Sequence, residues 1–115
     1  MNTKLVKISV NDSSEKYNEA ACLLKDGQVV GIPTETVYGL AGNAYSEDAV
    51  KRIFIAKGRP QDNPLIVHIS EFSELYELVS EVPENAKILA DAFWPGPLTM
   101  IYQNLIKFLY VLQQA

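Results

Sequence analysis

Hydroxyl-bearing side chains follow an apolar run early in the chain. The run Gln28–Ile32 leads directly into the segment Pro33–Leu40. This segment carries three hydroxyl groups, on Thr34, Thr36 and Tyr38. Ligands of open α/β sheets bind just beyond the carboxyl ends of strands, where such groups can reach them. Threonine hydroxyls also cap tight turns, so these residues leave both a ligand-binding loop and a structural turn open.

Basic side chains gather around a glycine in the middle of the chain. Lys57 and Arg59 flank this glycine, and the polar residues Asp62 and Asn63 follow it. Arginine offers a planar fork to phosphate oxygens and lysine offers a point charge, which suits an anion clamp for a phosphate or nucleotide. Cations in the last turn of a helix also complement the helix dipole, which is a purely structural role. Both interpretations fit the residues.

The single histidine, His68, lies in the apolar run Leu65–Ile69. Alternation along a strand places His68 on the same face as Ile66. A lone strand histidine is more often a structural group than a ligand, and no second histidine or cysteine set accompanies it, so we expect no metal site. The only cysteine, Cys22, falls on the apolar side of a predicted helix, where we expect it to pack.

Composition narrows the class of protein. The 115 residues suffice for one domain at most, with 48% hydrophobic and 21% charged residues. A net charge of −4 argues against a protein that grips nucleic acid through a general basic coat. One cysteine excludes an intramolecular disulfide. No apolar run reaches transmembrane length and no signal-peptide core follows the N-terminus, so we expect a cytoplasmic protein without membrane contact.

Helices and strands must position these residues. The apolar run Lys4–Val10 predicts a strand. Asp12 and Glu15 have the spacing of a capping box, which predicts a helix start. That helix ends at Gly27, and Gln28–Ile32 predicts the next strand. The order strand, helix, strand favours a parallel pair and an α/β layer architecture.

The rest of the chain continues the alternation. Ser46 is a predicted helix cap, and Gly58 ends that helix. A strand, two helices and a strand are then predicted at Leu65–Ile69, Ser70–Val79, Pro83–Phe93 and Leu98–Tyr102. The final residues, Gln103–Ala115, contain no acidic residue and seven large apolar ones, which is typical of an amphipathic helix.

Taken together, four motifs resemble the YrdC/Sua5 family of threonylcarbamoyl-AMP synthases. The motifs occur in order, at compatible spacing, and are Pro33–Leu40, Lys57–Pro60, Asn63–His68 and Trp94–Thr99. The resemblance runs from about Leu5 to Ile101. It implies an α/β fold with a YrdC-like twisted mixed sheet and flanking helices around a concave, positively charged cavity.

The resemblance also implies an activity. Family members condense L-threonine, bicarbonate and ATP into L-threonylcarbamoyladenylate and pyrophosphate. Their product supplies the t6A modification at adenosine 37 of tRNA, through the threonylcarbamoyl-transfer machinery that acts on tRNA. The expected substrates are therefore these three compounds, with Mg²⁺ accompanying ATP. Family members have also been linked to double-stranded RNA.

Residue roles carry over from the family motifs one position at a time. Thr36 and His68 match positions that contact L-threonine in the family. Thr34 and Tyr38 match motif residues that shape the pocket. These four residues are the threonine side of the site that the resemblance implies.

The phosphate side of the implied site comes from the second and third motifs. Arg59 and Asn63 match positions that contact ATP, and Lys57 with Arg59 forms the KxR motif of the family. Lys57 and Arg59 are the expected catalytic residues, because the reaction needs charge neutralisation at phosphate more than a covalent nucleophile. Lys57 is also expected to contact ATP.

The resemblance ends within a few residues of Tyr102. Family domains are nearly twice as long as this chain, and their second half supplies further contacts through an SxN motif. We therefore expect residues 1–102 to be the N-terminal part of a YrdC-like domain, a truncated half-domain. Residues 103–115 are expected to be an aberrant tail. Shifting the tail codons by one base permits Lys-Ser-Asp-Lys-Ile-Ser-Leu-Cys-Val-Thr-Ala-Gly, which resembles the family and is compatible with a frameshift near Gln103.

The resemblance leaves three interpretations of the chain open. The first is a synthase fragment that we expect to be inactive as it stands. The second is a nucleotide- or double-stranded-RNA-binding module without catalysis, although the net charge of −4 disfavours general RNA binding. The third is a nonfunctional product whose uncovered strand edges and apolar faces predict poor solubility.

Overall fold

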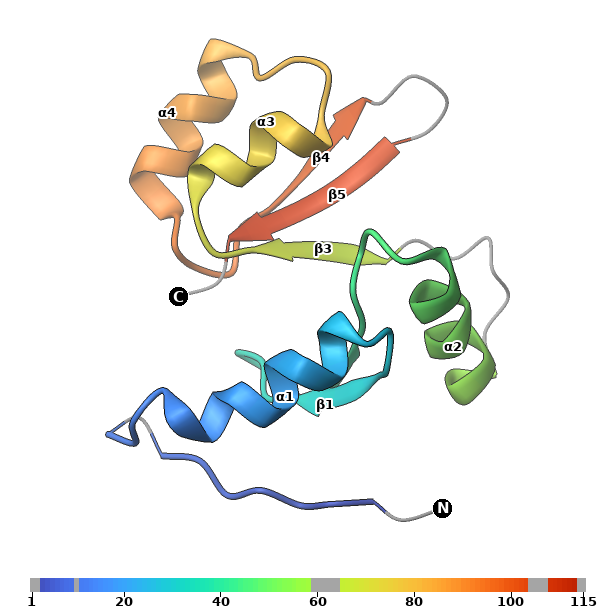
Figure 1. Ribbon diagram of the computed structural model, residues 1–115. Helices are drawn as coiled ribbons and strands as arrows, with labels where there is room; N and C mark the ends of the chain where they lie inside the picture. The colour runs from blue at the N-terminus through green and yellow to red at the C-terminus, as the bar shows by residue number, and fades with distance from the viewer. Residues whose placement is uncertain (1–2, 10, 59–64, 104–107, 114–115) are drawn as a thin grey trace. The chain divides into compact units, whose positions relative to one another are not determined.

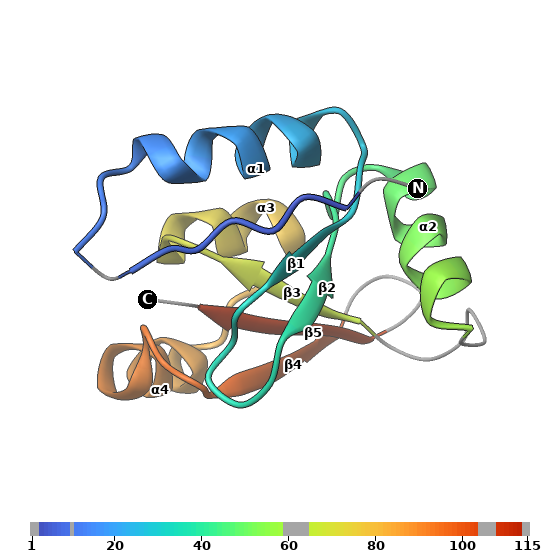
Figure 2. The ribbon, with the colours of Figure 1, turned by 90° about the horizontal axis from the view of Figure 1, so that it is seen from below.

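The computed structural model describes residues 3–9, 11–58, 65–103 and 108–113 (Figures 1 and 2). The chain forms two units, Met1–Arg59 and Pro60–Ala115, and each is described by itself. No helix in the described ranges is long and apolar enough to cross a membrane.

The first unit begins with an extended segment and the helix α1 (Glu15–Lys25). Residues 3–9 form no strand, so the strand expected at Lys4–Val10 is wrong. A strand persists only when a neighbouring strand accepts its backbone hydrogen bonds, and no described strand pairs with this segment. Its Lys4 instead forms an exposed ion pair with Glu19 on α1, with 2.8 Å between the charged atoms.

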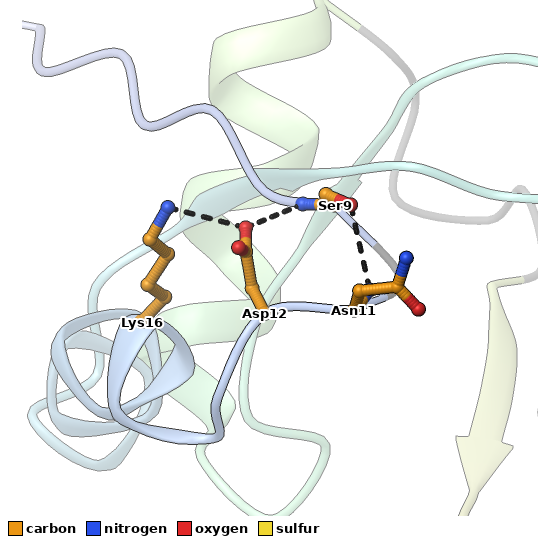
Figure 3. Close-up of polar contacts among 4 residues, drawn as sticks. All are labelled: Ser9, Asn11, Asp12 and Lys16. Atoms are coloured by element: carbon orange, nitrogen blue, oxygen red, sulfur yellow. Dashed lines mark hydrogen bonds and ion pairs between the residues drawn. The ribbon is translucent and has the colours of Figure 1, made fainter.

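The helix α1 starts without the expected capping box. Asp12 turns back and accepts a hydrogen bond from the Ser9 backbone N–H at 2.7 Å, and it also pairs with the Lys16 ammonium at 3.1 Å (Figure 3). The residue at the N-cap position is Ser14, whose side chain makes no capping bond. Cys22 is exposed, so its expected packing role is also wrong. None of the residues of this helix is buried.

A short hairpin follows α1. The strands β1 (Val30–Ile32) and β2 (Gly39–Ala41) are antiparallel, and Ile32 lies opposite Gly39. The loop between them is Pro33–Tyr38. The parallel pairing expected for the first sheet is therefore wrong, because β1 pairs with the next segment of the chain. Local pairing through a short loop costs less chain entropy than a crossover.

The helix α2 (Glu47–Lys57) confirms its prediction. The Ser46 hydroxyl accepts a hydrogen bond from the Ala49 backbone N–H at 3.2 Å. Gly58 ends the helix with φ of +63°, a left-handed conformation that glycine adopts without a Cβ clash. The buried side of α2 consists of Ala49, Ile53 and Phe54.

In its described residues the second unit contains a three-stranded sheet with helical segments on one side of it (Figure 1). Its strands are β3 (Ile66–Ile69), β4 (Thr99–Gln103) and β5 (Phe108–Gln113). The order is β3-β5-β4, with β5 parallel to β3 and antiparallel to β4. The helical segments are the 3-10 turn η1 (Phe72–Glu74), α3 (Leu75–Leu78) and α4 (Glu84–Phe93).

The strand β5 corrects the expectation for the tail. Residues 103–115 were expected to form an amphipathic helix, yet Phe108–Gln113 is the central strand of this sheet. Aromatic and β-branched residues in this segment favour extended structure. Backbone hydrogen bonds with strands on both sides outweigh the marginal stability of an isolated short helix.

The core of the second unit lies between the sheet and its helices. Leu75 is fully buried there, and Trp94 donates a hydrogen bond from its indole Nε1 to the Leu98 carbonyl at 2.6 Å. Burial raises the pKa of the Tyr102 hydroxyl, which donates to the Met100 sulfur at 3.5 Å. The core residues are Ile69, Leu75, Val79, Ala86, Ala90, Trp94, Met100 and Tyr102.

Candidate functional site

The hydroxyl-rich segment forms the loop of the β1–β2 hairpin. The Thr34 hydroxyl donates to the Val37 carbonyl and accepts from the Thr36 backbone N–H at 3.4 Å. A Cβ at Gly39 would lie 3.5 Å from the Thr34 methyl group, so this side chain also contacts the start of β2. Thr34 therefore organises the loop, and the structural turn that the residues suggested is present.

The tip of the same loop presents its other side chains to solvent. Thr36 is exposed, and Tyr38 is 84% exposed. Val37, between them, is 72% exposed although it is apolar. Because the loop backbone is held by Thr34, these exposed groups are presented on an organised turn. Exposed side chains on an organised loop are suited to ligand binding. The segment can therefore be a structural turn and a ligand-binding loop at the same time.

The expected phosphate-binding cation Lys57 lies in the last turn of α2 and is exposed. Within the described part of the chain no carboxylate pairs with it, whereas Lys51 on the same helix pairs with Glu47 at 3.3 Å. The Lys57 ammonium is thus available to an anion. Arg59 and Asn63, the other expected ATP contacts, lie outside the described residues.

His68 belongs to the second unit and lies on the exposed face of β3, together with Ile66. The alternation expected for this strand is confirmed, since Ile69 is buried on the opposite face. The His68 Nδ1 lies 3.2 Å from the Ile66 carbonyl. A carbonyl oxygen accepts, so in this contact the proton lies on Nδ1, which donates to the Ile66 carbonyl.

The site residues fall into two groups, one in each unit. The first unit holds the loop Pro33–Tyr38 and the cation Lys57, and the second unit holds His68. In the described ranges no group of three side chains from His, Cys, Asp or Glu could hold a metal ion. The described site residues offer hydroxyl and imidazole hydrogen bonding together with a cationic contact to an anion.

Two polar contacts near these groups are absent from the predictions made from the sequence. The Arg52 guanidinium on α2 donates to the Gly27 carbonyl at 2.7 Å, across 25 residues of sequence. The Glu74 carboxylate accepts from the backbone N–H groups of Ser70 at 2.8 Å and Glu71 at 3.3 Å, directly after β3. The Ser70 bond, more than the Glu71 bond, holds the pKa of Glu74 below its ordinary value. The Glu71–Glu74 spacing of a capping box was the available signal for the second contact.

Residues 22–113 match the family model of Sua5, YciO and YrdC, which carries the description "Telomere recombination". The match extends over most of the chain. The chain belongs to this family, as the resemblance of its motifs implied.

Relatives in this family carry one name. The chain is 52% identical over 99 residues to a threonylcarbamoyl-AMP synthase of Pyrococcus abyssi, with 86% of this chain and 29% of the relative covered. It is 55% identical over 95 residues to a threonylcarbamoyl-AMP synthase of Bacillus subtilis, with 83% and 27% covered. The chain thus spans less than a third of the length of these two relatives.

Solved structures show the same fold. Sua5 of P. abyssi complexed with L-threonine matches with a TM-score of 0.82 and 46% identity, covering 90% of this chain and 33% of that one. A double-alanine variant of the same protein matches with a TM-score of 0.87 and 45% identity, covering 92% and 36%. These matches confirm the expected YrdC-like α/β fold class.

Proposed function

We propose that this chain is part of a threonylcarbamoyl-AMP synthase and that residues 1–102 correspond to the first part of its YrdC-like domain. The whole enzyme would form L-threonylcarbamoyladenylate and pyrophosphate from L-threonine, bicarbonate and ATP in the cytoplasm. The product would pass to the machinery that modifies tRNA. The observation that carries the proposal is identity of 52% and 55% to two enzymes of this name.

The threonine side of the proposed site uses hydrogen bonds from Thr36 and His68, whose roles rest on the family motifs. The exposed Thr36 hydroxyl on the organised loop would bind polar groups of L-threonine, and Thr34 and Tyr38 would shape that pocket. The exposed imidazole of His68 would form a hydrogen bond with the substrate amine or hydroxyl. A similar protein complexed with L-threonine supports threonine as the amino acid.

The phosphate side of the proposed site uses charge. Lys57, exposed and without a described carboxylate partner, would contact ATP together with Arg59 and Asn63, whose roles rest on the family motif. Mg²⁺ would accompany ATP as its counter-ion.

The proposed reaction has two bond-forming steps. The threonine amine attacks the carbon of bicarbonate, and loss of water gives a carbamate. A carbamate oxygen then attacks the α-phosphate of ATP in line, and pyrophosphate leaves with the electrons of the broken P–O bond. Lys57 and Arg59 would neutralise the phosphate charge that develops, and the loop and His68 would orient the amino acid.

Pyrophosphate release by the purified 115-residue chain, with and without L-threonine and bicarbonate, tests the proposal. Calorimetric titration with ATP runs beside it. Lys57→Ala should weaken ATP binding about tenfold, the loss of one charged contact to phosphate. Lys87→Ala on α4, which removes only a surface ion pair of 3.9 Å with Glu84, is the control.

The combined outcomes separate the candidate functions. Threonine-dependent pyrophosphate release supports the synthase. ATP binding that depends on Lys57, without pyrophosphate release, supports nucleotide binding by these residues, as an inactive synthase fragment or as a binding module. Binding of double-stranded RNA in a gel-shift assay would favour the RNA-binding module instead. If the chain neither releases pyrophosphate nor binds ATP or double-stranded RNA, these 115 residues have none of the candidate functions by themselves.

A further inference from the structure

We infer that Arg52 is a positioning residue that fixes the orientation of α2, and with it Lys57, relative to the β1–β2 hairpin and its hydroxyl loop. The inference rests on the proposed function for the roles of Lys57 and Thr36. The carrying observation is the 2.7 Å hydrogen bond from the Arg52 Nη1 to the Gly27 carbonyl, which joins α2 to the turn ahead of β1.

The turn at Gly27 is itself well held. Gly27 has φ of +79°, and its N–H donates to the Leu24 carbonyl at 3.1 Å. The next N–H, of Gln28, donates to the Leu23 carbonyl at 2.9 Å, which completes a helix-terminating turn. A Cβ at Gly27 would lie 3.8 Å from the Ser46 hydroxyl oxygen, so the turn lies against the start of α2. Arg52 therefore bonds to a turn whose backbone is itself hydrogen-bonded.

A second attachment lies on the other strand of the hairpin. A Cβ at Gly42, directly after β2, would lie 3.2 Å from the Ile53 side chain and 3.5 Å from Ala49. Because Val30 is paired with Ala41, Gly27 and Gly42 flank the same open end of the hairpin. Ile53 and Ala49 of α2 lie near Gly42, and apolar neighbours of this kind place no directional restraint on the helix. A directional hydrogen bond at Gly27 supplies such a restraint.

Two parts of the proposed site belong to the first unit: the loop that carries Thr36 and the cation Lys57. Thr36 lies further along the chain than Gly27, and Lys57 lies further along the chain than Arg52. β1 runs from the attached end straight into the loop that carries Thr36. Along α2, Lys57 follows Arg52 by about 7.5 Å of helix axis. A change in the angle between α2 and the hairpin therefore moves the Lys57 ammonium relative to Thr36. Arg52 acts on the proposed ligand contacts through this angle and needs no contact with substrate.

The neighbouring Lys51 provides a matched control. It carries the same charge on the same exposed stretch of α2, but its partner is Glu47 on the same helix at 3.3 Å. Removing the Lys51 ammonium breaks no described contact between α2 and the hairpin. Arg52→Met keeps most of the aliphatic stem and removes the donor, whereas Arg52→Lys keeps a donor. Lys51→Met changes the net charge as Arg52→Met does.

Residual dipolar couplings of backbone amides in the 115-residue chain report the orientation of α2 relative to the hairpin directly. In the unchanged chain, Arg52→Lys and Lys51→Met, we expect couplings of α2 and the hairpin to fit one alignment tensor. In Arg52→Met we expect the α2 couplings to depart from it. ATP affinity, measured by calorimetry, should fall about threefold to tenfold in Arg52→Met and stay within twofold in the other variants.

The two readouts distinguish failure of this inference from failure of the proposed function. Couplings of Arg52→Met that match those of the unchanged chain overturn the positioning role, whatever the affinities. Altered couplings in Arg52→Met that Arg52→Lys restores support the role even where no variant binds ATP, an outcome that counts against the proposed function alone. An equal change in Lys51→Met overturns the inference, because charge rather than the bond to Gly27 would then be responsible.

Discussion

The Thr34 hydroxyl donates a hydrogen bond to the Val37 carbonyl, three residues further along the same loop. The same oxygen accepts from the Thr36 backbone N–H at 3.4 Å. One side chain thus holds both the tip of the loop and the backbone of the proposed threonine-binding residue. The conformation of Thr36 depends on a group that itself need not touch the ligand.

Thr34→Val keeps the shape of this side chain and removes its hydroxyl. We expect the free energy of unfolding to fall by about 1 kcal/mol, the usual net contribution of a hydrogen bond, and L-threonine binding to weaken about fivefold. Urea unfolding and calorimetric titration measure the two effects. Thr34→Ser retains the hydroxyl and should behave as the unchanged chain does. A valine variant with unchanged stability would show that the loop holds itself without Thr34.

The Glu74 carboxylate makes stability depend on pH. Its pKa lies below the ordinary 4.5, chiefly because it accepts the Ser70 backbone N–H and then that of Glu71. The folded state therefore favours the ionised form. This contribution is fully present above the unfolded-state pKa and is lost as the pH falls through the lower, folded-state pKa.

Glu74→Gln removes the titrating group. We expect a lower thermal midpoint at neutral pH and a smaller decline of the midpoint below the ordinary pKa of 4.5. Circular dichroism melts across the acidic range measure both. Glu84→Gln removes the same charge and only a 3.9 Å surface ion pair, so it is the control. Parallel pH profiles of Glu74→Gln and the unchanged chain would rule out this role for the carboxylate.

The parts of the fold that the sequence predicts correctly depend on local chemistry. α2 begins at the Ser46 cap and ends at Gly58, because a capping hydroxyl and a left-handed glycine act within one turn of the chain. The strand that carries His68 likewise has its expected alternation. By contrast, Asp12 has the spacing of a cap but bonds to Ser9 and Lys16 instead. Competing partners close in sequence are enough to defeat a spacing rule.

Strand pairing and distant polar contacts could not be predicted, because they depend on which segments meet. Lys4–Val10 and Phe108–Gln113 both have strand-forming residues, but only the second has partners on both sides in the described chain. The bond between Arg52 and Gly27 spans 25 residues, and no local pattern marks it. The motifs of the sequence identify Lys57 and the residues of the loop Pro33–Tyr38 as site residues. The contacts that hold these residues in place are seen only in the structure.

We expect substitution of Trp94 to lower the stability of the second unit more than any other loss of a polar contact in its core. Its side chain is buried, its indole N–H reaches the Leu98 carbonyl at 2.6 Å, and its ring lies 6.3 Å from that of Phe72. Trp94→Phe removes the donor and leaves unfilled volume, so we expect a loss of about 2 kcal/mol in the free energy of unfolding. The neighbouring Phe93 is 59% exposed, and Phe93→Ala should cost less than about 0.5 kcal/mol. Urea denaturation followed by circular dichroism compares them, and equal losses would contradict the buried contact.

Because β5 is the central strand, pairing with both of its neighbours depends on its backbone N–H and carbonyl groups. Val111 lies opposite Val67 of β3 on one side and Met100 of β4 on the other. Proline has no backbone N–H and is tolerated only at the edges of sheets. Val111→Pro should therefore disrupt pairing with both neighbours and collapse the sheet, with loss of the cooperative unfolding transition of this unit.

Val6→Pro is the matched control for this substitution. Residue 6 lies in the segment that forms no strand, so no described sheet pairing depends on its N–H. We expect Val6→Pro to leave the amide spectrum of the second unit unchanged, whereas Val111→Pro should lose the dispersed signals of Ile66–Ile69 and Thr99–Gln103. Retention of those signals in Val111→Pro would show that β3 and β4 are held without β5. The tail would then be dispensable for the sheet, as an aberrant addition would be.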